Sequence, residues 1–234
     1  MQQKSQLDLC HAYLRSAARR DGAKLRHRTG GPVITISREA GARGTSIAEE
    51  IIRKLDIHPT IERHFPWTLF NQDLLQHVID EHDLPKGTAS FFDEERHEHI
   101  RHLIGEILGL HPGTFTMMRK MAETTRKIAE TGNSVIVGRG ANFVTMDIAR
   151  AVHVRFIGSP KCRTKHLAEL TGLSLRDAAG ERIRRDRGRK RYIKRVFKQD
   201  IDDPHFYDLI VNTDRLSNSQ AADLIITALV QRMS

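Results

Sequence analysis

A short turn near the start of the chain has a composition typical of an anion-binding site. Residues 38–46, REAGARGTS, follow the β-branched run VITIS and precede the helix-spaced segment IAEEIIRKL. A loop between a strand and a helix directs several backbone N–H groups to one point at the positive end of the helix dipole, and glycines let an anion approach the backbone. The standard phosphate loop, G-x-x-x-x-G-K-[ST], is not matched, because this turn has no lysine. By itself, therefore, the turn only weakly indicates phosphate binding.

An arginine also stands at the end of a second β-rich run, SVIVGRG at residues 134–140. In parallel sheets, ligands bind beyond the carboxyl ends of the strands, so Arg139 is a candidate for anion binding. The alternative is a surface arginine that pairs with a nearby carboxylate.

Most of the excess positive charge lies in RIRRDRGRKRYIKRVFK, residues 182–198, which contains ten basic side chains. Arginine suits phosphate recognition because its planar fork takes two oxygens at once and stays charged. Ten basic residues exceed what a solvated helix face needs, which favours anion binding. A solvated helix and a nucleic-acid face are the alternatives. Against the latter, the only aromatic partners for base stacking are Tyr192 and Phe197.

The elements that position these residues alternate between strands and helices. Strands are predicted at 33–37, 134–140, 151–159 and 207–213, and helices at 47–55, 160–170, 174–197 and 217–230. Residues 68–131 have a helical pattern throughout. Alternation of this kind predicts an α/β fold with parallel strands joined by right-handed crossovers. Glycines and a proline in LRHRTGGP mark a boundary near residue 30.

The segment ITISREAGARGTSIAEEI resembles the opening of the cytidylate-kinase-like family of P-loop proteins, and the resemblance extends through most of residues 33–230. SVIVGRGANFV is similar to the family's strand-end Gly-Arg-Asp, and DDPHFYDLIVNT to its late strand. The resemblance implies a three-layer P-loop kinase fold with a mostly parallel sheet. It also implies a basic N-terminal extension (1–30) before a kinase-like domain (31–234), with a helical insertion at about 68–131 and a basic lid at about 182–200.

The resemblance also assigns roles to individual residues. Placed on the family's pattern, the usual lysine falls at Gly44, and the magnesium-facing hydroxyl falls at Ser46 with Thr45 beside it. Arg38 and Arg43 become candidates to supply the missing positive charge. The remaining assignments are nucleotide-binding Gly41, Ala42, Gly44, Thr45 and Ser46, acceptor-binding Arg139 and Asp73, and lid arginines Arg185, Arg189 and Arg191. Gly140 replaces the family's aspartate, a departure that argues against cytosine or deoxyribose selectivity.

Two functions are compatible with these residues. The first is ATP-dependent phosphoryl transfer to a nucleoside monophosphate, cytidylate-like, or to a similar phosphorylated small molecule, with Mg²⁺ as cofactor. The second is a catalytically degenerate kinase fold that binds a nucleotide, RNA or a protein. The absent lysine and aspartate favour the second, and the general agreement with the family pattern favours the first.

The composition indicates which kind of partner and which cellular compartment to expect. The net charge of +9 and the pI near 9.9 predict an anionic partner. Two cysteines predict a reducing compartment, and no apolar run approaches the ~20 residues of a membrane span. We therefore expect a cytoplasmic protein. The histidines of ERHEHIRH are expected on a solvated helix surface, because three or four convergent ligands would be needed for a metal site.

Overall fold

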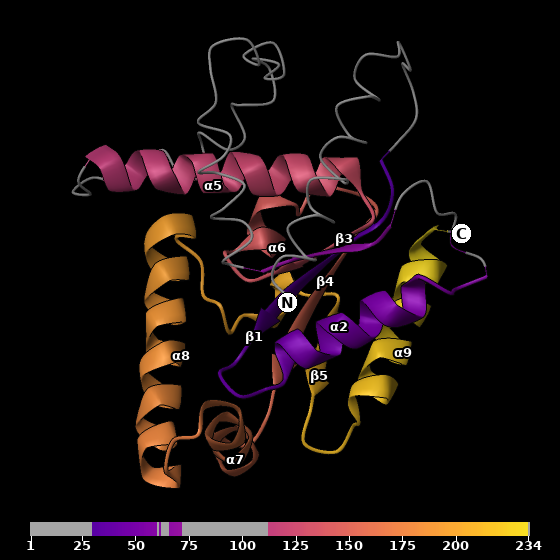
Figure 1. Ribbon diagram of the computed structural model, residues 1–234. Helices are drawn as coiled ribbons and strands as arrows, with labels where there is room; N and C mark the ends of the chain where they lie inside the picture. The colour runs from indigo at the N-terminus through magenta and orange to yellow at the C-terminus, as the bar shows by residue number, and fades with distance from the viewer. Residues whose placement is uncertain (1–29, 60, 62–65, 72–111, 234) are drawn as a thin grey trace.

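The computed structural model describes residues 30–59, 61, 66–71 and 112–233, which contain a five-stranded sheet. All neighbouring strands pair in parallel, in the order β2-β3-β1-β4-β5 (Figure 1). The strands are β1 (Val33–Arg38), β2 (Thr68–Phe70), β3 (Ser134–Val137), β4 (Ala151–Ile157) and β5 (Leu209–Asn212). The central strand β1 is thus flanked by β3 and β4, and its carboxyl end opens onto the candidate anion loop.

Helices cover both faces of this sheet (Figure 1). They are α2 (Gly44–Leu55), α5 (Pro112–Thr131), α6 (Ala141–Val144), α7 (Pro160–Thr171), α8 (Leu175–Phe197) and α9 (Asn218–Met233), with a 3-10 turn η3 (Pro204–Phe206). α2 and α9 share a core with one face of the sheet, whereas α5 and α6 pack on the other. The described part of the chain therefore has three layers, as the family resemblance implied.

The β1 strand shows why these residues form a buried parallel strand. Ile34 and Ile36 pack into the core beneath α2 and α9, and Val33 packs into the core beneath α5. All three are essentially inaccessible to solvent. A strand covered on both faces needs apolar side chains in both directions, which the run VITIS supplies.

Capping residues fix the helices of the α7–α8 hairpin. The Ser159 hydroxyl accepts a hydrogen bond from the N–H of Cys162, Pro160 occupies the first turn, and Gly172 ends α7 in the left-handed region at φ 70°. Ser174 caps α8 in the same way through the N–H of Asp177. Serine and proline at a helix start and glycine at its end are the expected chemistry, and the predicted start of α7 is confirmed.

One prediction about the elements is wrong, and one element was missed. Residues 68–70 were expected at the beginning of a helical segment, but they form β2, which pairs with β3 and is buried. The short helix α6 after β3 was not predicted at all. The other residues expected to be helical between 72 and 111, together with Asp73, the histidines of ERHEHIRH and the extension before residue 30, lie outside the described residues. No helix in the described part of the chain is long and apolar enough to span a membrane.

Candidate anion-binding site

The loop between β1 and α2 presents a free helix start. Arg43 precedes α2 in the left-handed conformation at φ 55°, and no side chain caps the helix. The first intrahelical bond runs from the N–H of Ile47 to the carbonyl of Arg43. The N–H groups of Gly44, Thr45 and Ser46 therefore lie ahead of the first helical bond, as donors at the positive end of the helix dipole.

Arg38, the last residue of β1, extends its side chain across this loop towards the end of β3. A Cβ atom added at Gly138 would lie 2.2 Å from an Arg38 guanidinium nitrogen, and one added at Gly44 would lie 2.9 Å from its Cγ. The side chain of Arg38 makes no hydrogen bond or salt bridge with any residue that the structure describes. Burial, followed by the nearby charges of Arg189 and Arg139, lowers the pKa of Arg38 to about 9. A buried, crowded cation without a counter-ion is suited to an external anion.

The turn after β3 brings a second arginine to the same place. Gly138, Arg139 and Gly140 all have positive φ angles, of 88°, 56° and 69°. The left-handed conformation is strained for arginine, and backbone strain of this kind is typical of functional sites. The Nε atom of Arg139 is buried and has no hydrogen-bond partner within the described residues. A buried donor without an acceptor is costly, so this group too is ready for a ligand oxygen.

The same turn explains the glycine that replaces the family's aspartate. A Cβ added at Gly140 would lie 2.2 Å from the ring of Phe197, the last residue of α8. Phe197 in turn stacks on Phe143 of α6, with ring centroids 5.1 Å apart. The space that an aspartate side chain would need is therefore filled by the apolar contact that holds α8 against the sheet.

A third arginine reaches the site from α8. Arg189 is half-buried, lies close enough to Arg38 to lower its pKa, and has its own pKa lowered, chiefly by burial. Among the described residues, its side chain bonds to Asp186 alone, at 3.3 Å. Together, Arg38, Arg139 and Arg189 form what we call the arginine cluster. Asp186 is the one carboxylate that pairs with it in the described part of the chain, so three positive charges face one negative charge.

That carboxylate also ties α8 to the loop. Asp186 accepts hydrogen bonds from the backbone N–H of Ala40, at 2.7 Å, and from the buried guanidinium of Arg163, at 2.6 Å. Arg163 also donates to the carbonyls of Ala40 and Gly158. Gly41, at φ 80°, is needed here because a Cβ would lie 2.1 Å from the carbonyl oxygen of Arg163. The predicted lid thus lies against one flank of the loop.

Other predicted site residues are placed elsewhere. The Arg43 guanidinium donates to the side chain of Asn218 at 3.0 Å and to the carbonyls of Thr213 and Leu216, so it points away from the arginine cluster. Arg185 pairs with Glu181 on α8 at 2.6 Å. Arg191 is exposed on the outer side of that helix. Of the predicted cationic residues, the structure therefore brings together Arg38, Arg139 and Arg189. It places Arg185 near Arg189 but paired with Glu181, and it separates Arg43 and Arg191 from the cluster.

The hydroxyls predicted to face magnesium lie at the start of α2. Thr45 is exposed and Ser46 is half-buried, and neither hydroxyl bonds to another residue that the structure describes. The carboxylate of the same loop, Glu39, already accepts a hydrogen bond from the N–H of Gly158 at 3.0 Å and pairs with Arg163. Because Mg²⁺ in such sites is held mainly by phosphates and water, with few protein ligands, the free hydroxyls fit it.

Two buried arginines were missed from the sequence. Arg163 holds the flank of the loop, and Arg155 of β4 donates to Ser37 at 2.9 Å and to Asp202 at 2.5 Å. Neither belongs to a recognisable local motif. Arg155 stands in the middle of a strand, AVHVRFI, and a charged residue in an otherwise buried strand was the one available signal.

The parallel sheet, its helical layers and the loop after β1 define a P-loop kinase fold. The chain matches the cytidylate kinase-like family over residues 33–215, and it belongs to that family. No curated protein matches it.

The chain also resembles solved structures. An uncharacterised protein from Eubacterium ventriosum is 21% identical with a TM-score of 0.65, and the match covers 86% of this chain and 98% of that one. A shikimate kinase from Bacteroides thetaiotaomicron is 14% identical, with a TM-score of 0.42, over 86% and 98% of the two chains. An APS kinase from Mycobacterium tuberculosis, solved with AMPPNP and APS, is 16% identical, with a TM-score of 0.45, over 87% and 99%.

Proposed function

We propose that this protein catalyses ATP-dependent phosphoryl transfer to a nucleoside monophosphate or a similar phosphorylated small molecule. The observation that carries the proposal is the arginine cluster at the mouth of the β1–α2 loop. Its three guanidinium groups come from three separate elements and meet with too few carboxylates to neutralise them. Phosphoryl transfer depends almost wholly on positioning and on such electrostatic stabilisation.

In this proposal the backbone N–H groups of residues 41–46 hold the donor phosphates, and Arg38 takes the place of the missing lysine. Arg139 orients the acceptor phosphate, and Arg189 contacts the transferring group from α8. Ser46 or Thr45 would hold Mg²⁺, which when bound neutralises charge on the donor phosphates. A general base is not needed when the acceptor is already a phosphate anion.

The test is ADP production by the purified protein with Mg-ATP and a panel of monophosphates and other phosphorylated small molecules. Activity with at least one acceptor is expected, and Arg139→Ala should abolish it. Arg184→Ala is the matched control, because Arg184 is exposed on α8, pairs with Glu181 and does not belong to the cluster, so the variant should retain activity. Silence across the panel by a protein that still binds ATP would reject the proposal for those acceptors.

A non-catalytic binding module is the second candidate. It is favoured by the hydrogen bonds that Asp186 of α8 accepts from Ala40 and Arg163. These bonds hold a carboxylate against the loop, at the place where a donor nucleotide would have to bind. If this candidate holds, ATP or inorganic phosphate should bind with an affinity that depends on Arg38, while no ADP forms under any condition. Detectable turnover that requires Arg38 would exclude it.

A further inference from the structure

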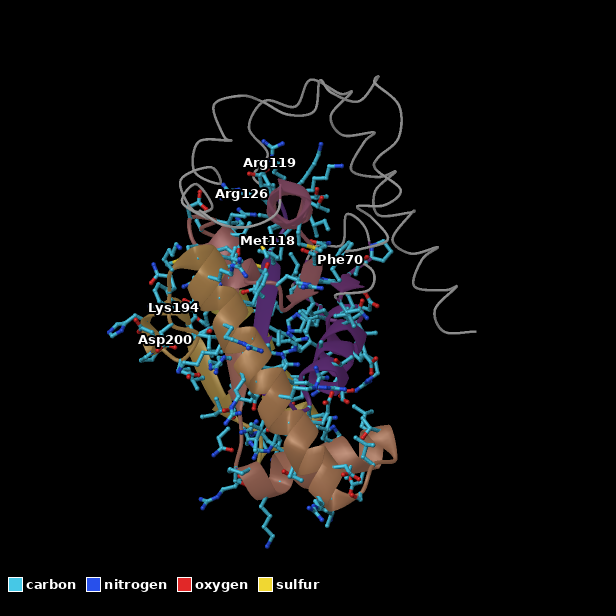
Figure 2. All side chains as sticks on the ribbon, turned by 90° about the vertical axis from the view of Figure 1, so that its left-hand side faces the viewer. Phe70, Met118, Arg119, Arg126, Lys194 and Asp200 are labelled. Atoms are coloured by element: carbon cyan, nitrogen blue, oxygen red, sulfur yellow. The ribbon has the colours of Figure 1, made fainter. Side chains whose placement is uncertain are left out.

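The side of α8 turned away from the β1–α2 loop carries a column of cations. Its members are exposed and recur every three or four residues, so they project from one side of the helix. We call this set the outer column, and it comprises Arg184, Arg187, Arg191, Lys194 and Lys198. Figure 2 looks onto this side of α8, with Lys194 labelled.

The outer column differs from the inner face of the same helix in how its charges are paired. On the inner face, Arg189 bonds to Asp186 and Arg182 bonds to the hydroxyl of Thr164. On the outer face, Arg184 pairs with Glu181, but Arg187 and Arg191 make no hydrogen bond or salt bridge with any described residue. The inner cations thus have roles within the fold, and these outer ones have none there.

This arrangement of charges does not stabilise the helix. Like charges four residues apart, such as Arg187 and Arg191, destabilise a helix. Lys194 and Lys198 lie near its carboxyl end, where the helix dipole favours cations, but Arg187 and Arg191 lie in the middle. Their positions are therefore not explained by the stability of α8.

Two glycines on α8 give a second, independent observation. Gly180 and Gly188 lie within the helix, where glycine is unfavourable, and a Cβ added at either would meet nothing within 4 Å. Packing therefore does not require them. Gly180 instead helps to line a shallow surface hollow of about 440 Å³, together with Ile183, Arg184, Arg187, Lys190 and Arg191. At this hollow a partner can approach the helix backbone closely.

We propose that the outer column is a docking surface for double-stranded DNA, bound through its phosphates. A single-stranded partner is disfavoured because base stacking needs aromatic side chains, and the aromatic residues of α8, Tyr192 and Phe197, pack into the core. An exposed α-helix fits the major groove of B-form DNA, about 12 Å wide, but not the deep, narrow major groove of A-form RNA.

The contacts available on this face predict binding dominated by phosphates. α8 contains no asparagine or glutamine, the residues that read adenine in the major groove, which leaves its arginines, able to read guanine, as the main base-reading side chains. Its exposed cations can neutralise phosphates on either side of the groove, and such contacts position a protein on DNA without reading the bases. The surface is separate from the arginine cluster, so the proposal stands independently of the phosphoryl-transfer function.

The test measures binding of the full chain to a fluorescent DNA duplex of mixed sequence by anisotropy over a series of salt concentrations. We expect log K to fall linearly with log salt, and R187Q/R191Q to reduce that slope by about 1.8, since each lost phosphate contact contributes about 0.9. The control K161Q/K165Q removes the same charge from two exposed lysines of α7 and should leave the slope nearly unchanged.

Several outcomes would overturn the proposal. These are undetectable duplex binding at low salt, equal slopes for the two double variants, or tighter binding to an A-form RNA duplex. Tighter binding to polyglutamate than to the duplex would instead assign the surface to an acidic protein partner. Thermal unfolding of R187Q/R191Q serves as the folding check, and its midpoint should not fall, because the variant removes only unpaired like charges.

Discussion

The two ends of the β1–α2 loop each carry an arginine, and the structure uses them in opposite ways. Arg43, at the helix end, is fully engaged within the chain, with Asn218 and two carbonyls of the β5–α9 connection. Arg38, at the strand end, has no partner among the described residues and is crowded by two other arginines. Arg43 thus stabilises the fold. The buried charge of Arg38 is unfavourable, and a bound anion would neutralise it.

This difference shows that hydrogen bonds and ion pairs within the chain distinguish a structural arginine from a functional one better than residue type or position in a motif does. Both residues lie in the same short loop, and both are candidates for replacing the absent lysine. Unfavourable charge that the rest of the structure tolerates is typical of functional sites. The position of the lysine itself, Gly44, is also informative, because a side chain there would collide with the Cγ of Arg38. A lysine at 44 and the observed Arg38 conformation thus exclude each other.

The largest expected effect follows from this mutual exclusion. Arg38→Ala should reduce turnover by about 10³-fold, as loss of a cation at the transferring phosphoryl group does elsewhere. Gly44→Lys alone should also be impaired, because the new side chain displaces Arg38. The double variant should recover at least about tenfold of the loss, since the lysine then has both room and phosphate to bind. Steady-state ADP production measures all three.

Additive losses in the double variant would contradict the exchange of lysine for arginine. Gly44→Ala is the control, because it introduces the same steric conflict without a charge and should give no recovery in the Arg38→Ala background. If turnover is absent in the unmodified protein, the same cycle is measured on ATP affinity.

A second prediction concerns stability: substitutions of Arg43 and Arg38 should change the free energy of unfolding in opposite directions. Arg43→Met removes charged hydrogen bonds to two partly buried carbonyls and should lower the free energy of unfolding by about 2–4 kcal/mol. Arg38→Met replaces an unpaired, buried cation with an apolar side chain of similar length and should raise it by about 1 kcal/mol. Urea unfolding with a common m-value measures both. Destabilisation of similar size in both variants would show that Arg38 is also structural.

The sequence was sufficient to predict the elements whose signals are local. The VITIS run and the serine–proline start of α7 each determine the local backbone through the chemistry of nearby side chains. The family pattern also identified Arg38, Arg139 and Arg189, which the structure brings together. β2 was missed because three residues cannot show a period, and its conformation depends on pairing with β3, which is distant in the sequence.

The direction of the arginines could not be predicted for the same reason. Arg43 turns towards carbonyls of Thr213 and Leu216, which only the completed fold brings near. Arg163 and Asp186 meet across the α7–α8 hairpin, where no spacing rule connects them. Long side chains such as arginine reach several possible partners, so their final contacts depend on tertiary structure.

The smallest expected effect is a pH dependence that again separates the two arginines. Burial and the charges of Arg189 and Arg139 lower the pKa of Arg38 to about 9, so above this pH the unliganded protein loses that charge. Because the folded pKa lies below the unfolded one, the folded state binds fewer protons above pH 9. This group's contribution to the free energy of unfolding therefore rises with pH above pH 9.

A bound anion favours the charged form of Arg38, so the affinity for inorganic phosphate should fall by up to about tenfold per pH unit above 9. Calorimetric titrations on either side of pH 9 measure this decline, which Arg43→Met should retain and Arg38→Met should lack. An identical decline in both variants would mean that another group titrates, and that Arg38 does not contact the phosphate.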